Sequence, residues 1–66
     1  MSAVNYRGHV ITPVRLPNGN WKADVSRTDG RPIELQGLKH MVLSTMEYPD
    51  KEAAIPEAQA DVDAIS

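Results

Sequence analysis

The stretch LPNGNWKADV (residues 16–25) decides the fold that the sequence predicts. Asn18 and Gly19 tolerate the positive φ angles of a type I′ turn, so this pair predicts a β-hairpin. Apolar and polar residues alternate directly after the turn, beginning with Trp21, and this period of two is typical of a half-buried strand. The stretch therefore predicts two antiparallel strands joined by a short turn.

Working outward from this hairpin, the sequence predicts three strands, at about residues 5–16, 20–28 and 32–45, of which the third is either one strand or two short ones. Pro13 has no N–H to donate to a neighbouring strand, so the first strand is expected at a sheet edge, or bulged at that residue. Gly37 predicts a bulge or bend within the third strand, and the register after it stays open.

The last part of the chain predicts a helix over about residues 49–65. Apolar residues recur there at helical spacing, namely Ala54 or Ile55, Ala58, Val62 and Ile65. Pro56 leaves two alternatives, because a proline inside a helix removes a hydrogen bond and clashes with the preceding turn. Either the helix continues with a kink at Pro56, which we prefer, or the helix begins near Pro56. Trp21 is expected to be mostly buried against this helix, beside Ile55 or Ala58.

These elements predict an α+β fold in one domain over residues 1–66: a three-stranded antiparallel meander with a single C-terminal helix on one face, in the order β-β-β-α. The opposite sheet face is expected to stay open to solvent. We expect this open face to carry Arg7, His9, Ile11, Arg15, Lys22, Asp24, Ser26, Glu34 and Gln36.

Three short motifs resemble a group of small uncharacterised bacterial β-β-β-α proteins, whose topology is similar to a shortened double-stranded-RNA-binding domain. The motifs are YRGHVI (Tyr6, Gly8, Ile11), GNWKA (Gly19, Trp21, Ala23) and DKEAAI (Asp50, Glu52, Ala53, Ala54). The resemblance covers most of the chain. It implies the fold and brings no established activity with it.

Charge is distributed unevenly along the chain. Residues 1–48 hold six basic and four acidic side chains, whereas residues 49–66 hold one basic and five acidic side chains. The absence of cysteine suits a reducing compartment, and no apolar run resembles a signal peptide or a membrane span. We therefore expect a cytoplasmic protein that does not enter a membrane.

Few residues offer catalytic or metal-binding chemistry. His9 and His40 are the only imidazoles, and outer strands of a meander would hold them about 9–10 Å apart, too far to share a zinc ion. Glu57 and Asp61 have the spacing of an acid–base pair on one helix face, but such pairs commonly form a solvated acidic surface. We expect no cofactor, no metal and no enzymatic activity.

The segment LKHMVLSTMEY (residues 38–48) has more apolar residues than one strand face can bury. If Leu38 and Val42 point toward the helix, Met41 and Leu43 point away from it and invite pairing with another chain. The preferred function is therefore a non-catalytic interaction or accessory protein, with a homodimer as one form. The expected interaction surface is Arg7, His9, Ile11, Arg15, Lys22, Met41 and Leu43.

A nucleic-acid-binding module is the alternative function. Basic side chains of the open sheet face, chiefly Arg7, Arg15 and Lys22, would contact phosphates in that case. The acidic net charge of −2 does not favour this alternative. A small enzyme comes third.

Overall fold

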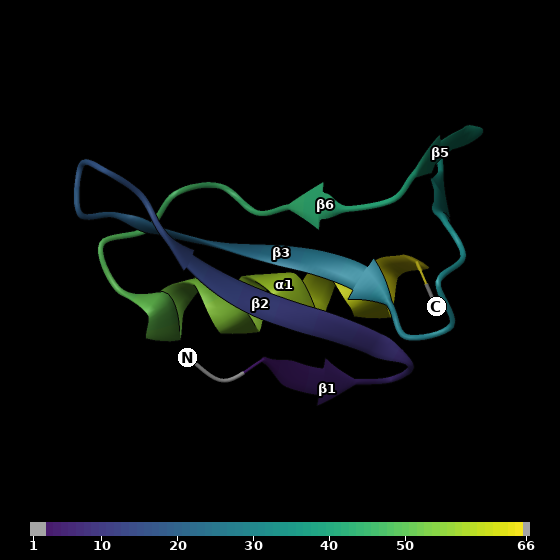
Figure 1. Ribbon diagram of the computed structural model, residues 1–66, viewed down its shortest axis with the longest axis horizontal. Helices are drawn as coiled ribbons and strands as arrows, with labels where there is room; N and C mark the ends of the chain where they lie inside the picture. Colours follow the sequence, from purple (N-terminus) through teal and green to yellow (C-terminus); the bar gives the residue numbers. More distant parts are fainter. Residues whose placement is uncertain (1–2, 66) are drawn as a thin grey trace.

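The computed structural model describes residues 3–65 and contains six strands and one helix. Four strands form an antiparallel sheet in the order β1-β2-β3-β6, and β4 and β5 form a separate hairpin (Figure 1). The elements are β1 (Val4–Tyr6), β2 (His9–Arg15), β3 (Trp21–Arg27), β4 (Ile33–Leu35), β5 (Leu38–His40), β6 (Leu43–Ser44) and α1 (Lys51–Ile65). The α+β class with antiparallel strands and one C-terminal helix is confirmed, but the three-stranded meander is wrong.

Two type I′ turns break the predicted strands. Arg7 and Gly8 have φ angles of 49° and 80° and link β1 to β2, while Gln36 and Gly37 have φ angles of 53° and 79° and link β4 to β5. A two-residue loop with positive φ at both positions is the tightest hairpin connection. Gly37 is therefore a turn residue: the predicted bulge is wrong, and the alternatives of a bend at Gly37 and of two short strands are the correct ones.

The turn between β2 and β3 lies where it was predicted but has a different form. Only Gly19 has a positive φ there, and its N–H donates to the Leu16 carbonyl at 2.9 Å. A two-residue loop at Asn18-Gly19 would need an N–H from Pro17 to close the hairpin, and proline has none. Leu16 donates to the Asn20 carbonyl instead, at 2.8 Å, so the loop has three residues.

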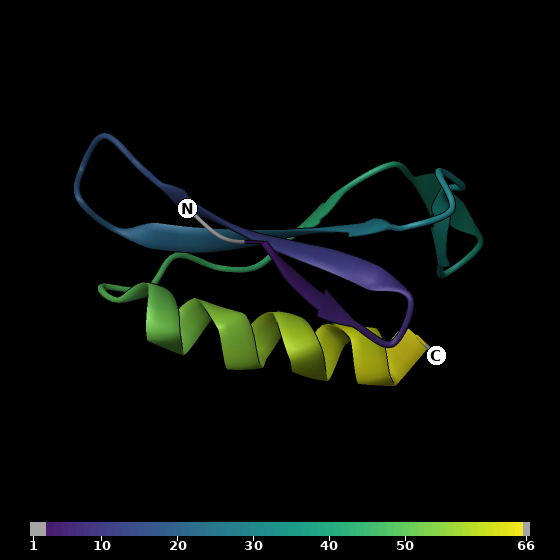
Figure 2. The same ribbon diagram turned by 60° about the horizontal axis from the view of Figure 1, so that its bottom comes forward.

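Helix α1 lies under one face of the four-stranded sheet (Figure 2). Alternate residues of β2 and β3 meet every fourth residue of α1, which confirms the predicted helical stripe. The fully buried apolar side chains are Ile11, Ala23, Val25, Ile33, Ala54, Ala58 and Val62. Three of these seven are alanines, so the helix packs close to the sheet over a thin core.

The pairing of β2 with β3 reverses the predicted faces of the first strand. Ile11 lies opposite Val25 and Pro13 lies opposite Ala23, so these residues face the helix, and Val10 and Val14 face the other way. Placing Ile11 on the open face is therefore wrong. Both faces of this strand are partly apolar, so only the register with β3 decides which one is buried.

β2 lies between β1 and β3, so the predicted edge strand is wrong. Within residues 3–65, β1 pairs with residues 9–11, and Pro13 lies beyond this pairing, where β2 pairs with β3 alone. The N–H and the carbonyl of its partner Ala23 both point away from β2, toward Thr45. The Ala23 N–H donates to Thr45 Oγ1 at 3.0 Å, and the Ala23 carbonyl accepts from the Thr45 N–H at 2.9 Å.

Helix α1 begins at Lys51 and continues through Pro56 to Ile65, so a helix that begins near Pro56 is wrong. Pro56 lacks the N–H that would donate to the Glu52 carbonyl one turn earlier. The stripe of Ala54, Ala58 and Val62 holds the helix to the sheet across this missing bond.

Trp21 is only partly exposed, so the expectation that most of its surface is buried is confirmed, although it is not part of the core cluster. Its backbone pairs with Tyr48 through hydrogen bonds of 2.6 Å and 2.7 Å. Lys51 Nζ lies 5.9 Å from the centroid of the indole ring, within the range of a cation–π contact. Trp21 therefore covers the start of α1, outside the cluster of buried side chains.

Candidate interaction site

One face of the β4–β5 hairpin is apolar, and its exposure rises from the core toward the turn. Ile33 pairs with His40 and Leu35 pairs with Leu38, so these four side chains lie on the same face. Ile33 is 2% exposed, Leu35 is 37% exposed and Leu38, next to the turn, is 63% exposed. The hairpin is thus anchored by Ile33 and carries its two leucines into solvent.

Two further apolar side chains follow the hairpin directly. Met41 is 61% exposed and Val42 is 52% exposed. We call Leu35, Leu38, Met41 and Val42 the hairpin surface. Grouped apolar side chains in solvent are typical of a site that contacts another molecule, whereas single exposed ones need no explanation.

The hairpin is separate from the main sheet. Strands β4 and β5 pair with each other, and each has three residues. In Figure 1 the hairpin projects beyond the end of the main sheet. A two-stranded hairpin is marginally stable in water unless its apolar face packs against another element. The exposed leucines of this hairpin have only part of that packing.

The two apolar residues of the predicted interaction surface, Met41 and Leu43, differ in exposure. Met41 is exposed as predicted. Leu43 lies opposite Val25 and packs against the core, so its predicted outward orientation is wrong. Leu38 and Val42, which were expected to point toward the helix, are exposed instead. The register shifts because residues 41–42 form a bend before β6.

Arg7 is engaged with the helix. Its Nη1 lies 2.6 Å from Asp63 Oδ1, and the Tyr6 hydroxyl donates to the same carboxylate at 3.1 Å. The hydrogen bond from Arg7 holds the pKa of Asp63 below its ordinary value. The same carboxylate raises the pKa of the Tyr6 hydroxyl. Arg7 therefore fastens the β1–β2 turn to α1, and its placement on the open face is wrong.

His9 is buried at 9% exposure, and its predicted place on the open face is also wrong. Its Nδ1 lies 3.0 Å from the Arg7 carbonyl. A carbonyl only accepts, so Nδ1 carries the proton in this contact. His40 lies in the separate hairpin, so the two histidines are not on outer strands of one sheet.

Arg15 and Lys22 lie on opposite faces of the sheet. Arg15 pairs with Trp21, at the helix-facing parity, and is exposed. Lys22 is on the open face as predicted, and its Nζ lies 3.4 Å from Asp24 Oδ1. The predicted basic face is therefore not assembled, because only one of its basic residues lies there.

Leu35 and Leu38 were absent from the predicted surface. The signal that identifies them is LQGL, in which Gln36-Gly37 forms a two-residue turn between apolar residues. Reading Gly37 as a bulge extended one strand through this turn and hid the hairpin.

No group of three or more His, Asp or Glu side chains within residues 3–65 is placed to hold a metal ion. No helix in that range is long and apolar enough to cross a membrane. Comparisons with protein-family models, curated proteins and solved structures found no match to this chain.

Proposed function

We propose that this protein is a small non-catalytic interaction protein that forms a homodimer through the hairpin surface. The observation that carries the proposal is the exposure of Leu35, Leu38, Met41 and Val42 on and beside a ribbon that is separate from the main sheet. Covering these side chains removes apolar area from water, which is the main driving force of association.

A second copy of the chain is the partner that the surface fits. A two-fold axis brings a surface against itself, so the leucines of one copy meet the leucines of the other. The flanking residues Glu34 and Lys39 are cross-strand neighbours of opposite charge. The hairpin therefore brings no net charge of its own from this pair to repel a second copy.

The available area predicts a weak dimer. A standard interface takes about 800 Å² from each partner, against a total surface of 4414 Å² for one chain. The four side chains of the hairpin surface form only the centre of such an area. We therefore expect dissociation at micromolar concentration and association toward millimolar concentration.

Sedimentation velocity over that concentration range tests the dimer. The wild-type mass is expected to rise toward twice that of one chain, and Leu38→Lys is expected to stay monomeric because it places a charge at the centre of the interface. Met46→Lys is the matched control, since Met46 is 77% exposed but follows β6, outside the hairpin surface. A monomeric wild type throughout, or equal dimerisation of Leu38→Lys, would contradict the proposal.

Binding to nucleic acid remains the alternative proposal. Arg7 and Lys22 each have an acidic neighbour, Asp63 and Asp24, which competes with phosphate. Amide-shift mapping at low salt with duplex RNA and with duplex DNA tests it, and shifts near Arg15 and Lys22 would support it. The relationship to double-stranded-RNA-binding-domain topology and a cytoplasmic location also stay proposals, supported by the motifs and by the absence of cysteine.

A further inference from the structure

A cavity of about 480 Å³ lies where the hairpin joins the rest of the molecule. Its walls come from β2, β3, the β3–β4 connection, both hairpin strands and the end of α1. The lining residues are His9, Arg27, Arg31, Pro32, Ile33, Glu34, Lys39 and Ile65. The volume lies within the range of small-molecule sites.

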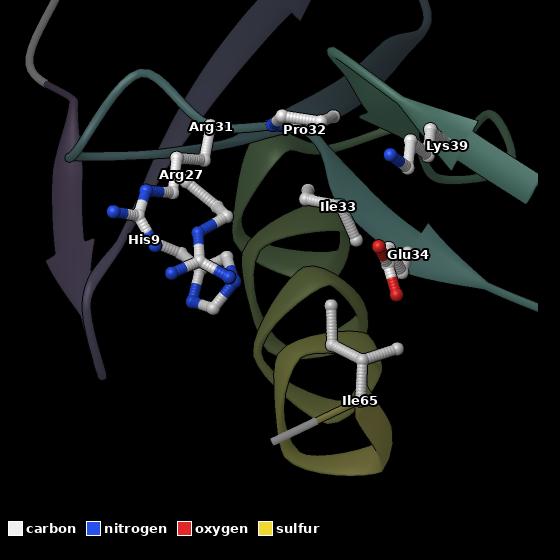
Figure 3. A pocket seen from close by; sticks show the side chains of 8 residues that line it. All are labelled: His9, Arg27, Arg31, Pro32, Ile33, Glu34, Lys39 and Ile65. Carbon is white, nitrogen blue, oxygen red and sulfur yellow. The ribbon is translucent and has the colours of Figure 1, made fainter.

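Cationic side chains dominate the polar part of this cavity. Arg27, Arg31 and Lys39 oppose one carboxylate, Glu34. Figure 3 shows Arg27 and Arg31 on the same side as His9, Glu34 and Lys39 on the other side of Ile33, and Ile65 on the helix below. The cavity thus has two arginines on one side and Lys39 with Glu34 on the other, with apolar side chains between and below them.

The three cations retain donors for a ligand. Within residues 3–65, the side chains of Arg31 and Lys39 form no ion pair. Arg27 uses Nε and Nη2 on Asp29, at 3.0 Å and 2.7 Å, so Nη1 remains. His9 Nδ1 is engaged by the Arg7 carbonyl, so Nε2 is the ring nitrogen left for the cavity.

The charge balance favours an anion. Three cations against Glu34 and Asp29 leave a net charge of +1. The carboxyl end of α1, at Ile65, adds the equivalent of about half a negative charge. The net charge of the cavity stays positive. Because Arg27 is paired with Asp29, Arg31 and Lys39 are the two cations left without an ion-pair partner within residues 3–65.

We propose that this cavity binds the phosphate group of a small phosphomonoester, with the organic part against Pro32, Ile33 and Ile65. Arginine matches phosphate geometry with parallel N–H donors, and lysine adds a point charge. His9 Nε2 accepts the P–OH proton of a monoanionic phosphate, or donates to the dianion when the ring is protonated. The ligand would join Arg31 and Lys39 of the hairpin region to Arg27 and His9 of the main sheet.

Amide NMR titration at constant ionic strength tests the site with phenyl phosphate, inorganic phosphate and benzoate as probes. Phenyl phosphate is expected to give saturable shifts at His9, Arg27, Arg31 and Lys39, and to bind more tightly than benzoate. Tighter binding of phenyl phosphate than of inorganic phosphate supports a phosphomonoester. Equal binding of the two assigns the site to the free ion and overturns the role of the apolar wall.

Two variants locate the site. Arg31→Gln and Lys39→Gln are each expected to weaken phenyl phosphate binding about tenfold, because each removes a charge-assisted hydrogen bond. Arg15→Gln removes the same charge outside the cavity and is expected to leave binding unchanged. Binding that is equal in Arg31→Gln and the wild type, or shifts reproduced by sodium chloride alone, would overturn the proposal. The outcome is separate from that of the dimer test for Arg31→Gln, because Arg31 lies outside the hairpin strands, whereas Lys39→Gln also leaves Glu34 without its cross-strand partner and is measured at concentrations where the chain is monomeric.

Discussion

Two regions of the molecule differ in how far their apolar side chains are buried: the main sheet together with α1, and the separate β4–β5 hairpin. In the main sheet and helix, Ile11, Val25 and Val62 are at most 1% exposed. In the hairpin only Ile33 is buried, and Leu38 is 63% exposed. The first region buries its apolar side chains within the chain, whereas residues 3–65 leave Leu35 37% exposed and Leu38 63% exposed. This difference in exposure is the observation on which the proposed homodimer rests.

The largest expected effect tests the buried side of this comparison. Ile11→Ala is expected to lower the free energy of unfolding by about 2–5 kcal/mol, because it leaves a cavity in a thin core. Leu38→Ala is expected to change it by less than about 0.5 kcal/mol in the monomer. Urea unfolding at micromolar concentration measures both variants. A similar loss in both would show that Leu38 belongs to the core and would end the comparison.

Pro56→Ala is expected to stabilise the main sheet and helix by up to about 3 kcal/mol, since it restores one helical hydrogen bond and removes a clash. Thermal unfolding followed by circular dichroism measures the rise in melting temperature. Hydrogen exchange of the hairpin amides should not change. A lower melting temperature would show that the apolar surroundings of Pro56, which lines a shallow cavity with Val4 and Pro13, outweigh the restored bond.

Gln36→Asn is expected to stabilise the hairpin by about 1 kcal/mol. Gln36 has a φ of 53°, in a region that asparagine tolerates better than most residues. Amide exchange in β4 and β5 should slow several-fold while the global melting temperature stays the same. A clear rise in melting temperature would mean that the hairpin unfolds together with the main sheet.

The smallest expected effect concerns the joint between the two regions. The hydrogen bond from Arg27, aided by the Arg31 N–H, lowers the pKa of Asp29 from 3.8 to about 2. A lowered pKa means that the charged carboxylate stabilises the folded state above pH 3.8, and that this contribution is lost as the pH falls toward 2. Asp29→Asn should therefore melt slightly below the wild type at neutral pH. Melting curves taken across the acid range should converge near the lower value, and a constant difference would contradict this assignment.

Much of the fold could be predicted because two patterns are local. The alternation from Trp21 to Val25 predicts β3, and the spacing of Ala54, Ala58 and Val62 predicts the buried stripe of α1. Both depend on periodicity within one element. The burial of Ala23 and Val25 and the continuation of the helix across Pro56 follow this pattern.

The candidate site depended on non-local information. The buried face of β2 is set by its pairing with β3, which brings Ile11 opposite Val25. Arg7 is drawn to Asp63, 56 residues away in the sequence, by the turn that precedes β2. Neither arrangement has a pattern along the chain. The exposure of Leu35 and Leu38 was within reach, since LQGL contains a two-residue turn, but glycine alone did not separate a turn from a bulge.

Pro13 has a further consequence for how copies of this chain meet. Its partner Ala23 directs its backbone groups to Thr45. The pair is thus not joined by hydrogen bonds, and the backbone of Pro13 faces away from β3, toward a side where no residue within 3–65 pairs with it. A strand added beside Pro13 would find no N–H donor at this residue. Edge-to-edge pairing with another chain is therefore disfavoured at Pro13. Pro13 therefore favours the proposed association through the hairpin surface over pairing of this strand with another chain.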